Sequence, residues 1–269
     1  MTRVLMIGAG RMGGAMLKGW TKALGDGFRF TVIDPHADWQ GLGLTPGPQL
    51  LLGRTLDEFP GDHTADIVVL ATKPQNLETA LQGARPAIGA GTLVVSIAAG
   101  VATRTMQDAI GAGQAVVRAM PNVGALVSRS VTAAFANPEV SPAQRDLVAE
   151  LFASIGAFSW IETEADLHLI TALSGSGPAY YFAFCEAMIA SAIAAGLSDE
   201  VARVLAIGTL VSAGRLLEDS GDPAGLRVMV TSPKGTTAAA LDALGDGGAL
   251  GALAARALEA ARARSVEMA

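Results

Sequence analysis

The chain has few of the residues on which several classes of function depend. Of its 269 residues, one is cysteine, three are histidine and 5% are aromatic. The single Cys185 excludes an intramolecular disulfide framework and a cysteine-cluster metal site. The histidines lack the spacing of zinc ligands, so we expect no metal. With a net charge of −6, the sequence also lacks the basic stripe and stacking aromatics of a nucleic-acid-binding protein.

Charged residues are also scarce, at 16%, whereas hydrophobic residues make up 51%. The run Pro178–Leu197 contains one charge, Glu186, and approaches the length of a membrane-spanning helix. Because Ala, Ser and Gly fill much of it, a buried helix is favoured over a membrane span. The N-terminus has neither the long apolar region nor the cleavage site of a signal peptide. We therefore expect a cytoplasmic protein without a membrane partner.

Short apolar runs alternate with helical stretches over the first part of the chain. Continuous apolar runs of this length predict strands that are buried on both faces, as in a parallel sheet covered by helices. A helix is predicted over Met12–Leu24 and another over Pro142–Ile155, with Ser141 as its N-cap. The predicted strands are Val4–Ile7, Phe30–Ile33, Ile67–Ala71, Leu93–Ile97, Ala115–Arg118, Val131–Phe135 and Phe158–Ile161.

No convincing strand follows Glu162. Helices are predicted over Glu164–Leu173, Pro178–Ala195, Asp199–Asp219, Asp222–Val230, Thr236–Leu244 and Leu250–Arg264. Several are Ala-rich and apolar on nearly every side, so they must bury more than one face. A bundle of this size cannot bury so much surface alone, which predicts a homodimer or larger oligomer. The predicted domains are residues 1–162, with a sheet, and 163–269, all helical.

A glycine-rich motif follows the first predicted strand and opens a helix. Gly8, Gly10 and Gly13 form G-x-G-x-x-G, with Arg11 and Met12 between the last two glycines. In this position Gly8 permits a tight turn, Gly10 lets the backbone approach a pyrophosphate, and Gly13 allows close packing of helix and strand. The helix N-terminus adds free N–H groups for the phosphates. The motif predicts dinucleotide binding; the alternative is an ordinary strand-to-helix turn.

Asp34 ends the second predicted strand, at the distance from the glycines typical of a ribose-binding carboxylate. Such a carboxylate accepts hydrogen bonds from the ribose hydroxyls of NADH and repels the 2′-phosphate of NADPH. No arginine follows within a few positions, and His36 is the nearest candidate for a phosphate. The residue therefore favours NADH and leaves NADPH open. The alternative is a turn residue before Pro35.

Three further loops end strands at the same edge of the predicted sheet, where open parallel sheets bind ligands. Pro74 biases Lys73 toward an extended backbone, which keeps Lys73 in its loop. The small residues around Ala99 suit a surface on which a nicotinamide lies. For each loop the alternative is an ordinary connection between elements that has no role in binding. The residues expected to line the cofactor here are Ala71, Thr72, Lys73, Pro74, Ala98, Ala99, Gly100, Pro121 and Asn122.

Two segments of the helical half also carry candidate site residues. The run Ser174–Pro178 is expected to break one helix and start the next, with Ser176 or Gly177 as N-cap, and its small residues allow close approach to the backbone. The N–H groups of Gly235, Thr236 and Thr237 open another helix and suit a small carboxylate. An N-cap at Thr236 or Thr237 is compatible with that role.

Taken together, these segments resemble those of the pyrroline-5-carboxylate reductase family over essentially the whole chain. Two runs are specific to that family, Leu173–Tyr180 and Thr231–Thr237. The resemblance implies a Rossmann domain followed by a helical dimerisation domain, similar to the C-terminal domain of 6-phosphogluconate dehydrogenase. It also implies an active site shared between subunits. Two departures are Lys234, where the family often has glycine, and Asp34, where NADPH-preferring members have small or basic residues.

By this resemblance the chain reduces 1-pyrroline-5-carboxylate to L-proline, the last step of proline biosynthesis, with NADH or NADPH. Ser174 and Gly175 would contact the imine substrate, Gly235, Thr236 and Thr237 would hold its carboxylate, and the Thr237 hydroxyl would lie near the ring nitrogen. A β-hydroxyacid dehydrogenase or another imine reductase of this architecture is the alternative enzyme. The former would need a lysine that Pro178–Leu197 lacks. A non-catalytic NAD-binding sensor is the alternative outside enzymes.

Overall fold

The computed structural model describes residues 1–59 and 61–269. The chain divides into two compact units, and each is described here by itself. Residues 1–176 together with 261–269 form the first unit, and residues 177–260 form the second. The domain boundary expected near residue 162 stays a prediction.

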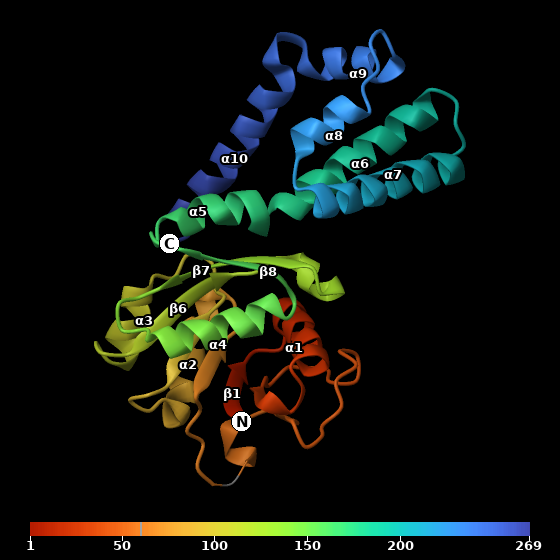
Figure 1. Cartoon of the computed structure of the whole chain (residues 1–269). Helices are drawn as coiled ribbons and strands as arrows, with labels where there is room; N and C mark the ends of the chain where they lie inside the picture. Colours follow the sequence, from red (N-terminus) through yellow and green to blue (C-terminus); the bar gives the residue numbers. More distant parts are fainter. Residues whose placement is uncertain (60) are drawn as a thin grey trace. The chain divides into compact units, whose positions relative to one another are not determined.

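The first unit is built on an eight-stranded sheet with the order β3-β2-β1-β4-β5-β6-β7-β8 (Figure 1). Strands β1 to β6 run parallel, β7 runs antiparallel to β6, and β8 runs parallel to β7. The predicted Rossmann-type sheet is therefore confirmed. The strands are β1 (Thr2–Ile7), β2 (Phe28–Ile33), β3 (Leu50–Gly53), β4 (Ile67–Leu70), β5 (Leu93–Ser96), β6 (Ala115–Met120), β7 (Ser130–Ala136) and β8 (Gly156–Ile161).

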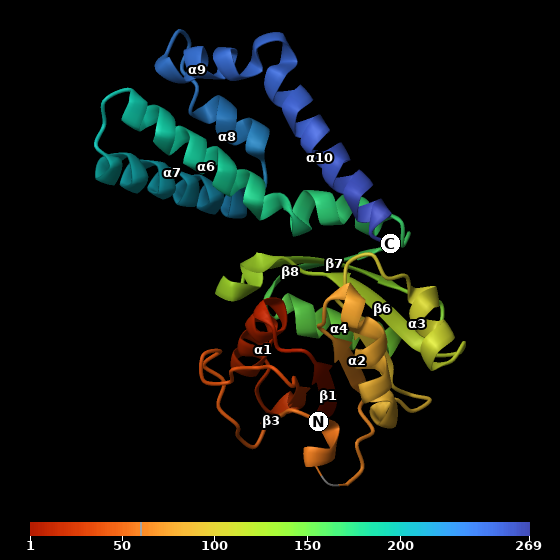
Figure 2. The ribbon, with the colours of Figure 1, turned by 180° about the vertical axis from the view of Figure 1, so that it is seen from behind.

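Helices bury both faces of this sheet, which explains why its strands are apolar without alternation. Helices α1 and α4 supply Trp20 and Phe152 to the core on one face. Helices α2 and α3 supply Leu81 and Met106 to the core on the other, a side seen from behind in Figure 2. The helices of this unit are α1 (Arg11–Ala23), α2 (Leu77–Ala84), α3 (Thr103–Ile110), α4 (Pro142–Ala153) and α5 (Asp166–Ile170).

The predicted start of α4 is confirmed in detail. The Ser141 hydroxyl accepts a hydrogen bond from the Gln144 N–H at 3.3 Å, and Gln144 Oε1 accepts one from the Ser141 N–H at 2.9 Å. Pro142 occupies the first turn, where its missing N–H costs nothing. This reciprocal capping box explains why the helix could be located from the sequence.

The helix start expected at Ser174–Pro178 is confirmed, because α6 begins at Gly177 with Pro178 in its first turn, but the interruption before it is not an extended N-cap. After α5 the chain forms a π-helical turn over Thr171–Gly175, and α6 begins at Gly177. Between them Ser176 has helical angles (φ −87°, ψ −20°) rather than the extended backbone of an N-cap. The wider π turn accommodates the small residues without ending the helical path, and such turns are frequent at functional sites.

The second unit is helical throughout, with short connections. Helices α6 and α7 lie side by side (Figure 1). The helices are α6 (Gly177–Ala194), α7 (Asp199–Ser220), α8 (Pro223–Met229), α9 (Thr236–Gly245) and the first part of α10 (Ala249–Glu267). Their apolar side chains are largely exposed; Tyr181 of α6 and Val204 of α7 are 65% and 67% accessible. In the part of the chain that is described, no helix is long and apolar enough to cross a membrane.

Candidate functional site

The glycine-rich turn after β1 is tight for steric reasons that the structure makes explicit. Gly8 has φ +99°, and a Cβ placed there would lie 2.7 Å from the carbonyl oxygen of Ala71. Its N–H donates to the Ile33 carbonyl at 2.8 Å, which joins the ends of β1 and β2. A Cβ on Gly13 would lie 2.5 Å from the Gly8 carbonyl oxygen. These two glycines therefore allow the turn itself and the close packing of α1 against it.

Gly10 differs from its neighbours because space surrounds it. A Cβ built on Gly10 would meet no heavy atom within 4 Å, and the residue is exposed. It precedes α1, a helix of 13 residues whose first N–H groups have no partner inside the helix. Open space, a bare backbone and a helix N-terminus in one place fit the pyrophosphate of a dinucleotide.

Asp34 lies beside this turn, half-buried, at the end of β2. Its Oδ2 accepts a hydrogen bond from the Ala9 N–H at 2.7 Å, and its Oδ1 accepts one from the His36 N–H at 2.8 Å. The carboxylate therefore fixes the glycine turn, a role that the sequence did not predict. An ionised carboxylate has further lone pairs, so these contacts leave it able to accept the hydroxyls of a ribose.

The loops after β4 and β5 lie at the same edge of the sheet. Lys73 is exposed and extended (φ −65°, ψ 151°), as Pro74 requires. The Thr72 hydroxyl is buried and has no hydrogen-bond partner among the residues that the structure describes. Gly100 has φ +79°, and a Cβ there would lie 2.8 Å from the Met268 carbonyl oxygen. Ala98 is buried in the core with residues of α2 and α3, and the half-buried Ala99 is the residue here whose methyl group could lie against a planar ring.

A buried ion pair joins the ends of three elements behind these loops. Arg118 of β6 lies 2.8 Å from Glu164, with side-chain exposures of 7% and 26%. Glu164 also accepts hydrogen bonds from the Thr103 N–H at 2.8 Å and the Thr103 hydroxyl at 3.0 Å. Ala102, the N-cap of α3, has no capping side chain, so Glu164 caps that helix from a distance. The pair thereby anchors the segment that follows Gly100.

Asn122 connects the loop after β6 to the π-helical turn. Its Oδ1 accepts hydrogen bonds from the N–H groups of Gly124 and Val131, and its Nδ2 donates to the Ser174 carbonyl at 3.0 Å. A Cβ on Gly175 would lie 3.6 Å from the sulfur of Met120. The structure therefore brings Ser174 and Gly175 to the end of β6. The Asn122 side chain is committed to the fold, so a cofactor role predicted for Asn122 or Pro121 would rest on the backbone.

The start of α9, in the second unit, differs from the expectation in two respects. Its N-cap is Gly235 (φ −80°, ψ 172°), not Thr236 or Thr237. The Gly235 N–H donates to the Ser232 carbonyl at 3.0 Å and is not free, because Lys234 takes a left-handed conformation (φ 59°) that closes a turn. Thr236 and Thr237 are the first residues of the helix, so their N–H groups have no partner within the helix. These groups lie at its N-terminal end.

Comparison with known proteins identifies relatives of this arrangement. The family model for pyrroline-5-carboxylate reductase dimerisation matches residues 164–268. The pyrroline-5-carboxylate reductase of Pseudomonas aeruginosa is 36% identical over 268 residues, which are 99% of this chain and 97% of that protein. The chain belongs to the pyrroline-5-carboxylate reductase family. Its resemblance to this family, predicted from the sequence, is confirmed.

Solved structures of the family agree with the fold. A pyrroline-5-carboxylate reductase from Coxiella burnetii has a TM-score of 0.88 at 32% identity, covering 100% of this chain and 98% of that one. The Plasmodium falciparum enzyme, solved with NADP bound, has a TM-score of 0.81 at 26% identity, covering 99% and 98%. The predicted order of a Rossmann-type sheet followed by a helical dimerisation region is therefore confirmed for this family member.

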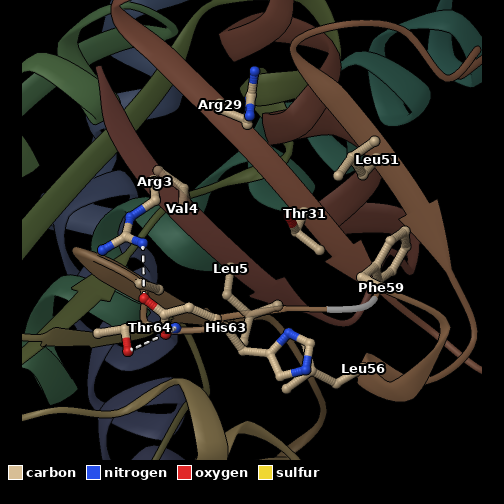
Figure 3. Close-up of a pocket in the computed structure, with 12 residues that line it drawn as sticks. Arg3, Val4, Leu5, Arg29, Thr31, Leu51, Leu56, Phe59, His63 and Thr64 are labelled. Carbon is tan, nitrogen blue, oxygen red and sulfur yellow. Dashed lines mark hydrogen bonds and ion pairs between the residues drawn. The ribbon is translucent and has the colours of Figure 1, made fainter.

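A separate cavity of about 230 Å³ lies at the opposite ends of the strands, where β1 and β2 begin (Figure 3). Arg3 and Arg29 line it, and Arg3 lies 3.6 Å from Asp62. Hydrogen bonds from the hydroxyl and the N–H of Thr64 lower the pKa of Asp62, with a smaller contribution from Arg3. Because this cavity is at the edge remote from Gly8 and Asp34, it is no part of the candidate dinucleotide site.

Across residues 1–59 and 61–269, no cluster of His, Cys, Asp or Glu could hold a metal ion.

Proposed function

We propose that this chain reduces 1-pyrroline-5-carboxylate to L-proline with a reduced nicotinamide dinucleotide, the last step of proline biosynthesis. The observation that carries the proposal is the turn at Gly8–Gly13, which leaves open space at Gly10 beside a helix N-terminus, in a member of the reductase family. The chain is accordingly an oxidoreductase that acts on a carbon–nitrogen double bond.

The residues at the sheet edge fit such a cofactor and divide the work of holding it. The N–H groups at the start of α1 would bind the pyrophosphate, and Asp34 would accept the ribose hydroxyls. Ala98, Ala99 and Gly100 would lie against the nicotinamide, with Lys73 at the rim. The bound dinucleotide would supply the hydride that converts the imine carbon, a CH=N group, into a CH2. Asp34 favours NADH over NADPH, because its charge repels a 2′-phosphate.

At the substrate end, the start of α9 supplies donors rather than acids. The N–H groups of Thr236 and Thr237, together with the helix dipole, would hold the substrate carboxylate. The Thr237 hydroxyl would hydrogen-bond the ring nitrogen, which takes its proton from solvent before the carbon takes up the hydride. A protonated imine is already electrophilic, so positioning accounts for the rate without a strong acid. Alignment of two reactants can contribute roughly 7–11 kcal/mol.

The helical unit would form the homodimer interface. Its match to a dimerisation family and the exposed apolar faces of α6 and α7 support this proposal. Isolated subunits would present large contiguous apolar patches, which soluble monomers rarely expose. The expected cytoplasmic location stays a prediction from the sequence.

The proposal is tested by following oxidation of NADH and of NADPH in the presence of 1-pyrroline-5-carboxylate. Thr237→Ala should lower kcat/KM by about tenfold or more, the equivalent of one hydrogen bond to a charged group, while Thr237→Ser should retain most of it. Thr105→Ala, on the exposed side of α3, is the matched control and should change nothing. Absence of oxidation with both cofactors would refute the function. Full activity in Thr237→Ala would refute only the role of that hydroxyl.

A further inference from the structure

The last turns of α10 pack with the sheet unit, although the helix begins in the helical unit. Ser265 Oγ and Nδ1 of His168, on α5, form a hydrogen bond of 3.0 Å where the two helices meet (Figure 1). Ser265 is 7% exposed, whereas residues 262–264 and 266–269 are exposed. The contact between Ser265 and His168 is therefore where the end of α10 is held.

The residues that follow Ser265 cover the loop after β5. A Cβ built on Gly100 would lie 2.8 Å from the Met268 carbonyl oxygen and 3.3 Å from the Ala269 nitrogen. Gly100 is buried and has φ +79°, so its lack of a side chain allows the backbone of Met268 to approach. Met268 and Ala269 continue the helical turn, because their N–H groups donate to carbonyls one turn earlier in α10, at 3.2 and 3.1 Å. A contact that fixes Ser265 therefore also fixes the backbone that covers Gly100.

The same loop has a second attachment at its other end. Glu164 accepts hydrogen bonds from the N–H and the hydroxyl of Thr103, the first residue of α3. The Leu167 N–H donates to the Glu164 carbonyl at 3.1 Å, so Glu164 and His168 belong to one short helical segment. This segment therefore holds the loop at Thr103 directly and at Gly100 through the end of α10.

The two parts of the loop differ in what supports them. The Ala98 N–H donates to Ser96 Oγ at 3.2 Å, and Ala98 is 5% exposed, so the sheet and its core hold the first part. Ala99 is only half-buried, and Gly100 is covered by the backbone of Met268. The second part of the loop, where a nicotinamide would lie, thus depends on the position of α10.

We propose that Ser265 is a positioning residue of the reductase, which through His168 holds the end of α10 over Gly100 and keeps this loop in the shape that receives the nicotinamide. The inference rests on the proposed function, in which Ala99 and Gly100 lie against that ring. Ser265 acts through the loop and not by contact with either reactant. Hydride transfer requires close alignment of the two reactants, so a loop that is free to shift weakens binding of the ring and slows the transfer.

The test separates the nicotinamide from the rest of the cofactor. Each protein is titrated with NADH or NADPH, whichever the wild type binds more tightly, and with the corresponding ADP-ribose, which lacks the nicotinamide. Ser265→Ala removes the hydrogen bond and should weaken binding of the dinucleotide about three- to tenfold, as for loss of one hydrogen bond. Its affinity for the ADP-ribose should be unchanged. The kcat for reduction of 1-pyrroline-5-carboxylate should fall by a similar factor.

Two further variants show whether the hydrogen bond itself is responsible. His168→Ala removes the other partner and should have the same selective effect. The double variant should bind no more weakly than either single variant, because the two side chains act as a pair. Arg264→Gln is the matched control, since Arg264 is an exposed neighbour of Ser265 that pairs with Glu267 of the same helix at 2.9 Å. That control should bind both ligands as the wild type does.

Two results would overturn the inference. Equal weakening of the dinucleotide and the ADP-ribose in Ser265→Ala would show a general loosening of the sheet unit, and unchanged affinities with unchanged kcat would remove Ser265 from any role in the site. The proposed function fails separately, if the wild-type protein oxidises neither cofactor in the presence of 1-pyrroline-5-carboxylate. In that case the ratio of the two affinities would still decide whether Ser265 acts on the nicotinamide loop.

Discussion

Gly8 and Gly10 stand two positions apart in one turn, and they are needed for different reasons. Gly8 combines φ +99° with backbone atoms of Ala71 at the position of a Cβ. Gly10 has ordinary angles (φ −61°, ψ −168°) and free space around it. The fold therefore requires one glycine, and the other is proposed to make room for a ligand, although both belong to the same motif.

This difference makes a paired prediction. Gly8→Ala should lower the free energy of unfolding by about 2 kcal/mol, because a left-handed backbone with a Cβ is strained. Gly10→Ala should leave the unfolding free energy within about 0.5 kcal/mol of the wild type, and weaken NADH and NADPH binding by about tenfold or more. Urea denaturation and fluorescence titration measure the two quantities. Normal cofactor affinity in Gly10→Ala would contradict the assigned pyrophosphate position.

Single residues of the site were predictable where their role depends on local chain geometry. Gly8 and Gly13 follow β1, and Asp34 follows β2 at the expected spacing. The structure places all three at the turn between β1 and α1. Ser265 lies 97 positions from His168 along the chain and becomes its neighbour only through the packing of α10 against α5. The use of the Gly235 N–H by Ser232 depends on the left-handed backbone of Lys234, which residue type alone does not indicate.

The ends of α3 and β6 and the segment before α5 depend on one carboxylate. Glu164 holds Arg118 and both donors of Thr103, and all of these contacts are wholly or largely shielded from water. Removal of this carboxylate leaves a buried guanidinium without its partner and α3 without a cap. The exposed pair Arg104–Asp108, also 2.8 Å apart, lies nearby on α3 and lacks both consequences.

We predict that Glu164→Ala lowers the free energy of unfolding by about 3 kcal/mol, because it breaks a buried ion pair and a helix cap. Asp108→Ala should cost less than about 1 kcal/mol, since its ion pair is solvent-exposed. Chemical denaturation of the two variants under identical conditions gives the comparison. Equal losses in both variants would show that burial of the Arg118–Glu164 pair has no energetic effect.

Most elements could be predicted because they have local signals. Apolar runs marked seven of the strands, and Ser141 with Pro142 marked α4. Strand β3 was missed, because Leu50–Gly53 has four residues at the sheet edge and follows an irregular stretch rich in glycine and proline. Only its pairing with Phe30–Ile33 defines it. The π turn at Thr171–Gly175 was missed for a similar reason, since small residues there are compatible with either a break or a wider helix.

Across the whole chain, apolar surface is distributed unequally. The sheet unit buries its large apolar residues on both faces, whereas α6 and α7 expose many of theirs, including Phe182 and Val204. A single chain leaves this surface in water, at a cost of roughly 25 cal/mol per Å² of apolar area. We expect a second copy of the helical unit to bury this surface. The same excess of apolar residues is what made a membrane-spanning helix an alternative in the sequence.

We expect Val204→Glu to shift the protein from dimer toward monomer, because it places a charge on the exposed apolar face of α7. Light scattering coupled to size-exclusion chromatography over a range of concentrations measures the shift. Leu51→Glu is the control, since Leu51 is an exposed apolar residue of the sheet unit. It should leave the mass unchanged. A Val204→Glu protein with the wild-type mass at every concentration would exclude this face from the interface.

The long reach of Glu164 has a consequence for the order of folding. The carboxylate that caps α3 lies 61 residues after Thr103 in the chain. During synthesis, α3 and the loop before it are made well before their cap leaves the ribosome. Closing so long a loop carries an entropic cost that grows with its length. We therefore expect the loop before α3 to gain its anchor late, after the residues of β7, α4 and β8 have been made, and a chain that ends before residue 164 to lack this cap.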